Sequence, residues 1–169
     1  MGLIIMSGKD VAVVTGSGRG IGMGVARQLA HDGMRIVIAE KQTDLLASAL
    51  ANLPGVGHIG IELDVSDEQS VERAFEQIDR QVGAIRVLVN NAGIMVANQV
   101  RPKLIDFNIE DWDRTFAVNV RGVFLCCRAF LKQQRKFQVE HSRIINMSSV
   151  TAQLGGFSAD AAYIASKAG

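Results

Sequence analysis

Apolar residues along this chain fall into short continuous runs that alternate with longer stretches of helical spacing. The short runs are rich in β-branched residues, which favour strands buried on both faces of a sheet. Five strands are therefore predicted, over residues 11–14, 35–39, 58–63, 85–89 and 144–147. Helices are predicted over residues 21–31, 45–53, 66–82 and 109–134, with a last helix from about Ala159. Strands that alternate with helices predict an α/β fold, a doubly wound parallel sheet flanked by helices.

Two of the predicted helices begin with polar residues that can cap them. Ser66 and Gln69 have the spacing of a capping box, and the acidic residues between them favour the positive end of a helix dipole. Asn108 can cap the helix over 109–134. Helical spacing places one set of apolar residues on a single face after Ser66, namely Val71, Ala74, Phe75, Ile78 and Val82. We expect this face to pack on the sheet.

The composition is that of one globular domain, which we expect to span residues 1–169. Hydrophobic residues make up 48% and charged residues 21% of the chain, and the formal net charge is +1. A balance so close to neutral produces no strong positive potential that would attract nucleic acid or an anionic membrane surface. No apolar run reaches the roughly 18 residues that span a bilayer. Cys126 and Cys127 are adjacent and lack zinc-ligand spacing, so we expect no metal site and a reducing, cytoplasmic location.

A glycine-rich turn links the first predicted strand to the first helix and reads TGSGRGIG over residues 15–22. A pyrophosphate needs free backbone N–H groups and the positive end of a helix, and side chains in such a turn would block its approach. The strict GxGxxG pattern is absent, because Ile21 stands at its last position. The pattern is TGxxxGxG, with fixed glycines at Gly16, Gly20 and Gly22. Glycines can simply mark a turn, but this turn has the context of a dinucleotide site.

An acidic residue ends the second predicted strand. Glu40 lies 18 positions after Gly22, near the spacing of a carboxylate that binds the adenosine ribose. Such a carboxylate accepts hydrogen bonds from a 2′-hydroxyl and repels a 2′-phosphate, which favours NAD. Arg19 and Lys41 are cations that could hold a 2′-phosphate, which favours NADP. Because Glu40 stands where the ribose should lie, NAD is the preferred expectation and NADP stays open.

The order of these and later motifs resembles the short-chain dehydrogenase/reductase family over nearly the whole chain, from Val11 to Gly169. The motifs are TGxxxGIG, Asp64-Val65, Asn90-Asn91-Ala92-Gly93, Asn119, Ser148-Ser149 and Tyr163-x-x-x-Lys167. The resemblance implies a Rossmann-type NAD(P)-binding domain. The cofactor-binding residues that it implies are Gly16, Ser17, Gly18, Arg19, Gly20, Ile21, Gly22, Glu40, Asp64, Val65, Asn91, Ala92, Gly93, Tyr163 and Lys167.

The resemblance also implies an oxidoreductase that transfers a hydride between NAD(P)(H) and an alcohol or ketone, with Asn119, Ser149, Tyr163 and Lys167 as catalytic residues. Tyr163 and Lys167 are four residues apart and share one helical face. A free phenol is a poor base at neutral pH, and a nearby ammonium favours its phenolate. Tyr163 would then be the general acid or base, Ser149 would bind the substrate oxygen, and Asn119 would hold a proton-relay water.

The family resemblance carries two further expectations. Relatives continue beyond the position of Gly169, so we expect the sheet and the last helix to be incomplete at the C-terminal end, without the later strands and the substrate loop. Relatives often pair through the long helix, so a homo-oligomer, dimer or tetramer, is expected.

Two alternatives to the oxidoreductase stay open. One is a non-catalytic nucleotide-binding fragment or regulatory protein, and the other is a sugar-nucleotide epimerase or dehydratase. The glycine spacing opposes the epimerase, because such enzymes usually have GxxGxxG.

Overall fold

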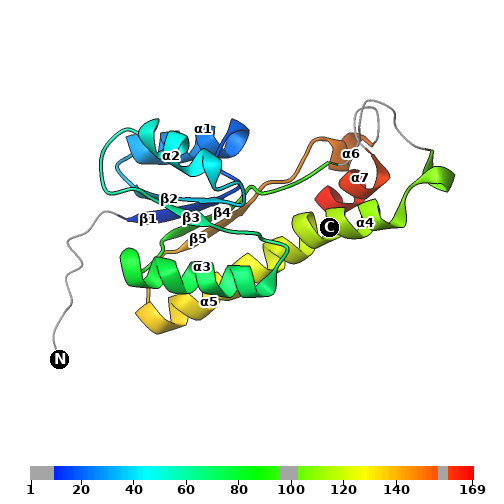
Figure 1. Ribbon diagram of the computed structural model, residues 1–169. Coiled ribbons are helices and arrows are strands. Elements are labelled where there is room, and N and C mark those ends of the chain that lie inside the picture. The colour runs from blue at the N-terminus through cyan, green and yellow to red at the C-terminus, as the bar shows by residue number, and fades with distance from the viewer. Residues whose placement is uncertain (1–9, 96–102, 156–159) are drawn as a thin grey trace.

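The computed structural model describes residues 10–95, 103–155 and 160–169, and it contains one parallel sheet (Figure 1). The strand order is β3-β2-β1-β4-β5, and every neighbouring pair is parallel. The strands are β1 (Val11–Thr15), β2 (Arg35–Glu40), β3 (Ile59–Glu62), β4 (Val87–Asn90) and β5 (Arg143–Asn146). The helices are α1 (Gly20–His31), α2 (Asp44–Ala51), α3 (Glu68–Gln81), α4 (Ile109–Phe116), α5 (Gly122–Phe137), α6 (Thr151–Leu154) and α7 (Ala161–Ala168).

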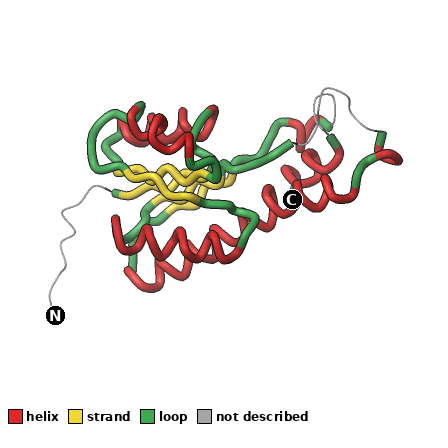
Figure 2. The backbone as a smooth tube through the Cα atoms, viewed as in Figure 1, coloured by secondary structure: helices red, strands yellow, loops and turns green. Residues whose placement is uncertain are grey.

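Helices cover both faces of this sheet (Figure 2). Successive strand residues point to opposite faces, so β1 contributes to two hydrophobic cores. Ala12 and Val14 pack with residues of α1 and α2, whereas Val11 and Val13 pack with residues of α3 and α5. The largest side chain buried in the second core is that of Phe130, from α5. The predicted α/β fold with a doubly wound parallel sheet is therefore confirmed.

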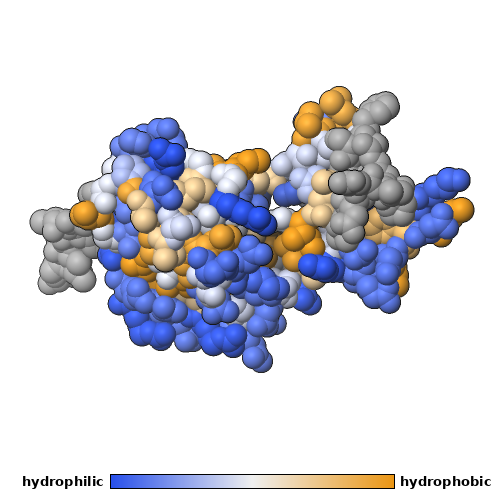
Figure 3. Space-filling view, turned by 45° about the horizontal axis from the view of Figure 1, so that its top comes forward, coloured by the Kyte–Doolittle hydropathy of each residue, from blue (hydrophilic) through white to orange (hydrophobic). Residues whose placement is uncertain are grey.

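The chain reverses its direction across the sheet at β1. It passes from β1 to β2 and β3 on one side, and then returns to β4 and β5 on the other. In an open parallel sheet, such a switch point leaves a crevice at the carboxyl ends of the two central strands. The glycine turn follows β1 and the Asn91-Ala92-Gly93 segment follows β4, so both open on this crevice. Figure 3 shows a hollow between the body that contains the sheet and the part that contains α4, α6 and α7.

The predicted capping box of α3 is wrong. Asp67, not Ser66, is the cap residue, and its carboxylate accepts hydrogen bonds from the backbone N–H groups of Gln69 and Ser70, both at 3.1 Å. The Ser66 hydroxyl instead donates to Asp64 at 2.6 Å. A hydrogen bond from the Ser66 hydroxyl to the charged Asp64 carboxylate is stronger than a bond between the neutral hydroxyl and a backbone N–H. Ser66 therefore bonds Asp64, and the next residue, Asp67, caps the helix.

The long predicted helix over 109–134 is a continuous helical rod, but its middle is not α-helical. Asn108 caps it as expected by accepting from the Glu110 N–H at 2.8 Å. Between α4 and α5 the residues Ala117–Arg121 form a π turn, η2. A π turn inserts one residue into an α-helix and often marks a functional site. A short 3₁₀ turn, η1 (Leu104–Asp106), precedes α4.

The last strand and the last helix of the described chain are β5 and α7. The strand β5 is one edge of the described sheet, and all four of its residues are exposed, including Ile144 and Ile145. The helix α7 begins at Ala161 and is capped by Asp160, whose carboxylate accepts from the Tyr163 N–H at 2.7 Å. The predicted start at Ala159 lies outside the described residues. Among the described helices, none has the length and apolar character needed to cross a membrane.

Candidate active site

Two adjoining cavities open on the crevice at the carboxyl ends of β1 and β4. One, of about 640 Å³, lies toward β2 and β3 and includes Glu40, Asp64 and Val65 in its walls. The other, of about 540 Å³, lies toward α6 and α7 and includes Ser149, Tyr163 and Lys167. Both are lined by the same four residues at their junction, Arg19, Asn91, Gly93 and Ile94. The structure thus brings most of the predicted site residues to one continuous crevice.

The glycine turn has no room for a Cβ at Gly16 or at Gly22. Gly16 has φ +61°, and a Cβ there would lie 2.8 Å from the Ala92 Cα. A Cβ on Gly22 would lie 2.5 Å from both the Gly16 carbonyl oxygen and the Asn91 Nδ2. Gly20 also has a left-handed φ of +60°. The glycines are therefore required by the path of the backbone, and they leave its surface open to a ligand.

Two other predicted residues of this turn face inward. The Ser17 side chain is buried, and its hydroxyl donates to the Val14 carbonyl at 2.6 Å. Gly18 lies against Glu40, because a Cβ at this position would be 2.9 Å from the Glu40 Cγ. Neither residue lines the two cavities. Their contribution is to hold the shape of the turn, whereas Ile21, with 71% of its surface exposed, lines the cavity near α7.

The segment after β4 anchors the glycine turn. The Asn91 side-chain amide donates to the Thr15 and Gly16 carbonyl oxygens, at 2.9 and 3.0 Å. The backbone N–H groups of Asn91 and Ala92 donate to the Thr15 hydroxyl, at 3.1 and 3.0 Å. Thr15 was not among the predicted site residues, although it opens the TGxxxGxG pattern. Its buried hydroxyl links the two loops that form the crevice floor.

The Glu40 carboxylate is held at the end of β2 by backbone N–H groups. One oxygen accepts from Gly18 at 3.0 Å, and the other accepts from Lys41 and Gln42 at 2.9 and 3.2 Å. Three donors fix the carboxylate in place without a positive partner. The Glu40 carboxylate therefore lies at a fixed position in the wall of the cavity near β2 and β3.

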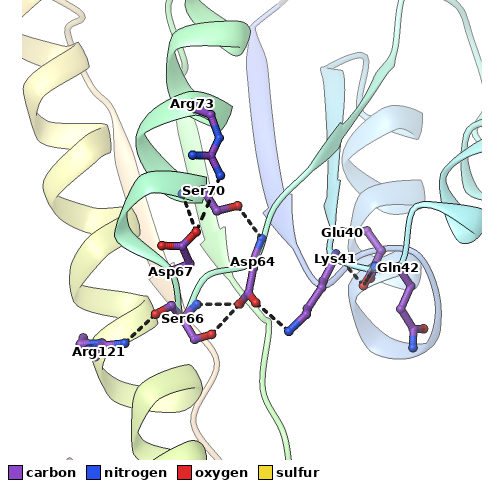
Figure 4. A network of polar contacts seen from close by, with 9 residues as sticks. All are labelled: Glu40, Lys41, Gln42, Asp64, Ser66, Asp67, Ser70, Arg73 and Arg121. Atoms are coloured by element: carbon purple, nitrogen blue, oxygen red, sulfur yellow. Dashed lines mark hydrogen bonds and ion pairs between the residues drawn. The ribbon is translucent and has the colours of Figure 1, made fainter.

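Asp64 and Lys41, which both line this cavity, form an ion pair (Figure 4). The Lys41 Nζ lies 2.6 Å from one Asp64 carboxylate oxygen, and Ser66 donates to the other through its N–H and its hydroxyl. Partial burial alone would raise the pKa of Asp64, but the hydrogen bonds from Lys41 and Ser66 and the charge of Lys41 outweigh it, so this pKa is lowered. Asp64 is consequently ionised at neutral pH.

The predicted catalytic residues of α7 lie in the second cavity. The Lys167 Nζ lies 5.9 Å from the centroid of the Tyr163 ring and donates to the Met147 carbonyl oxygen at 2.7 Å. Burial lowers the pKa of Lys167. The Ser149 hydroxyl lies 2.9 Å from that of Thr151, whereas the Ser148 hydroxyl donates to the Lys167 carbonyl at 2.9 Å. Both serines line this cavity, and the Ser148 hydroxyl is the one bonded to the end of α7.

Asn119 does not line either cavity. Its side chain is 4% exposed and lies in the π turn behind the crevice. Its amide pairs with both backbone groups of Ile94, accepting at 2.9 Å and donating at 3.0 Å, and it also donates to the Ser166 hydroxyl at 2.9 Å. Ser166 in turn donates to the Tyr163 carbonyl at 2.8 Å. Asn119 therefore connects the loop after β4 with the helix that carries Tyr163, and the predicted water relay through it stays a prediction.

Comparison with known proteins settles which family this crevice belongs to. The profile of the family described as short chain dehydrogenase matches residues 10–169. The chain is a member of the short-chain dehydrogenase family. Its glycine turn, its Asn91-to-Gly93 segment and its α7 lie where the motifs of this family predicted them.

Several curated relatives are similar over most of this chain. The 3-oxoacyl-[acyl-carrier-protein] reductase FabG of Aquifex aeolicus is 37% identical over 156 residues, which are 90% of this chain and 60% of that protein. The meso-2,3-butanediol dehydrogenase of Serratia marcescens is 34% identical over 94% of this chain and 60% of that protein. The short-chain dehydrogenase/reductase eriH of Hericium erinaceus is 36% identical over 97% and 65%. The chain spans about three fifths of the length of these relatives.

Proposed function

We propose that this short-chain dehydrogenase transfers a hydride between NAD(P)(H) and an alcohol or carbonyl substrate. One observation carries the proposal: Tyr163, Lys167 and Ser149 line the same cavity as Gly22 and Ile21 of the glycine turn. A dinucleotide whose diphosphate rests on that turn would reach the tyrosine with its nicotinamide end. Relatives named as reductases and dehydrogenases support the same class of reaction.

The residues fit a dinucleotide. The turn leaves backbone where side chains would otherwise stand at Gly16 and Gly22, and it opens the N-terminal end of α1 toward the crevice. We propose that the diphosphate binds there and that Glu40 binds the adenosine ribose. Asp64 and Val65 would border the adenine, and Lys167 would hold the nicotinamide ribose. When bound, the nicotinamide ring would supply or accept the hydride.

The protein side of the reaction is a proton transfer at the substrate oxygen. The Tyr163 phenol would give this proton to a carbonyl oxygen in reduction and take it from an alcohol in oxidation. The Lys167 ammonium lies beside the Tyr163 ring and would stabilise the phenolate. The Ser149 hydroxyl would hydrogen-bond the substrate oxygen. Asn119 would act through position, because its contacts hold α7 against the loop after β4.

We propose NAD as the preferred cofactor. The Glu40 carboxylate is fixed by three backbone donors and cannot turn away easily from a 2′-phosphate. Titration of the protein with NADH and with NADPH, followed by turnover assays on a panel of alcohols and ketones, tests both parts of the proposal. We expect NADH to bind at least several-fold more tightly than NADPH. Binding without turnover on any substrate would leave a non-catalytic nucleotide-binding protein and contradict the oxidoreductase.

A homo-oligomer, dimer or tetramer, is also part of the proposal. The rod formed by α4, η2 and α5 exposes 58% of Phe124 and 54% of Leu131, and a shallow cavity of about 420 Å³ lies beside Phe124. We expect a mass of two or four chains by light scattering, and Phe124→Asp should shift it toward the monomer. Val56→Asp is the matched control, because Val56 is 80% exposed outside this rod. A monomeric unsubstituted protein contradicts the proposal.

A cytoplasmic location completes the proposal. It rests on the two free cysteines, of which Cys126 is buried and Cys127 is half-buried. Burial raises the pKa of Cys126 to about 12, so its thiol is unreactive at neutral pH. Such thiols act as small core residues, which suits a reducing compartment.

A further inference from the structure

The opposite charges of Glu40 and Lys41 at the end of β2 are held by different partners. The Glu40 carboxylate is fixed by backbone N–H groups, whereas the neighbouring Lys41 side chain is 69% exposed and is tied through its ammonium to Asp64. We propose that Asp64 is a positioning residue for cofactor choice, which disfavours a 2′-phosphate by holding the Lys41 ammonium. This inference rests on the proposed function, because it assumes that a nicotinamide dinucleotide occupies the crevice.

If the Lys41 ammonium is released from Asp64, its position allows it to bind a 2′-phosphate. It follows Glu40 directly and lines the same cavity, next to the position proposed for the adenosine ribose. A lysine is a compact charge on a flexible stem, so it can turn toward a new anion at little cost in conformation. Its present partner, Asp64, follows the neighbouring strand β3 and lines the same cavity (Figure 4). The ammonium is therefore directed toward Asp64 and away from the Glu40 carboxylate.

Asp64 is the rigid member of the pair. Only 26% of its side chain is exposed, and Ser66 donates to its carboxylate twice, from the N–H at 2.9 Å and from the hydroxyl at 2.6 Å. The Asp64 N–H donates to the Ser70 hydroxyl at 3.0 Å, and the Ser66 carbonyl accepts from Arg121 at 2.6 Å. The loop after β3 is thus tied to α3 and to the π turn. Because Ser66 holds the Asp64 carboxylate, Lys41 must break its ion pair with Asp64 to reach another anion.

The size of the effect follows from the exposure of the pair. Exposed ion pairs change equilibrium constants by about 1.4- to 5-fold, and the half-buried, hydrogen-bonded carboxylate places this pair near the upper end. NADPH would have to break the pair to use Lys41, whereas NADH, which lacks the phosphate, would leave it intact. Releasing Lys41 should therefore lower the ratio of the NADPH Kd to the NADH Kd by about five-fold.

The experiment is a double-mutant cycle on this ratio. Asp64→Asn keeps the shape of the side chain and removes its charge, and Lys41→Gln removes the ammonium. Dissociation constants for NADH and NADPH are measured by fluorescence titration of the unsubstituted protein, both single variants and the double variant. Using the ratio cancels any change in adenine binding, which both nucleotides share. We expect Asp64→Asn to lower the ratio about five-fold in the Lys41 protein and to leave it unchanged in the Lys41→Gln background.

Two results would overturn the inference. The ratio could stay constant in Asp64→Asn, or it could fall equally in both backgrounds, which would mean that Asp64 repels the phosphate directly. If Asp64→Asn does not fold by circular dichroism, Ser66→Ala makes the same comparison, because it removes one of the two Ser66 contacts that hold Asp64. We expect Ser66→Ala to lower the ratio about two-fold. Failure of the unsubstituted protein to bind either nucleotide would contradict the proposed function instead.

Discussion

Tyr163→Phe is expected to lower turnover of an alcohol or carbonyl substrate by about two to four orders of magnitude, the usual contribution of a general acid or base. The substitution removes the hydroxyl that would carry the proton and keeps the ring beside Lys167. Because the ring and α7 stay in place, the NADH Kd should change by no more than about two-fold. Steady-state absorbance of NADH measures the first quantity, and fluorescence titration measures the second.

The serine pair after β5 offers a matched comparison for the same chemistry. Ser149→Ala removes the hydroxyl proposed to bind the substrate oxygen, whereas Ser148→Ala removes a contact with the Lys167 carbonyl at the end of α7. We expect the Ser149 variant to lose far more turnover than the Ser148 variant. Unchanged turnover in Tyr163→Phe would remove the tyrosine from the reaction and with it the proposed mechanism.

Gly22→Ala is expected to lower the free energy of unfolding by about 1–3 kcal/mol and to weaken NADH binding at least ten-fold. Its Cβ would lie 2.5 Å from the Gly16 carbonyl oxygen and from the Asn91 Nδ2. One of these groups has to move, and both shape the surface on which a diphosphate would rest. Urea unfolding followed by circular dichroism and titration with NADH measure the two effects separately.

Gly24→Ala is the control for this substitution. Gly24 lies in the same helix, two residues later, and a Cβ there meets nothing within 4 Å. Alanine favours an exposed helix by up to about 1 kcal/mol over glycine, so Gly24→Ala should bind NADH normally and unfold at slightly higher urea. Equal affinities in the Gly22 and Gly24 variants would show that the turn does not support the ligand.

The arrangement of the fold could be predicted from the sequence because strong local patterns agree with it. The β-branched runs became strands within a few residues of their predicted bounds, and the helix with Val71, Ala74 and Phe75 on one face packs them into the core. The crevice could also be predicted, because each motif follows a strand and the carboxyl ends of parallel strands meet at one edge.

The details that the sequence did not predict are the hydrogen-bond partners of individual polar groups. The cap of α3 moved from Ser66 to Asp67 because the Ser66 hydroxyl binds Asp64, and no helical pattern encodes this choice. The partners of the Asn119 side chain, Ile94 and Ser166, lie far from it in the sequence and could not be inferred from the motif. The role of Thr15 depends likewise on a loop that follows another strand. Long-range contacts of this kind are decided by tertiary packing.

The π turn has a consequence for how this region of the chain can change length. Each residue of an α-helix advances the helical phase by about 100°, so deleting one residue from the turn would rotate α5 by that angle relative to α4. After such a rotation, the packing of Phe130 in the core and the hydrogen bond from Asn119 to Ser166 could not both be kept. Insertions and deletions should therefore be excluded from the interior of this rod, and tolerated changes in length should be confined to the connections on either side of it.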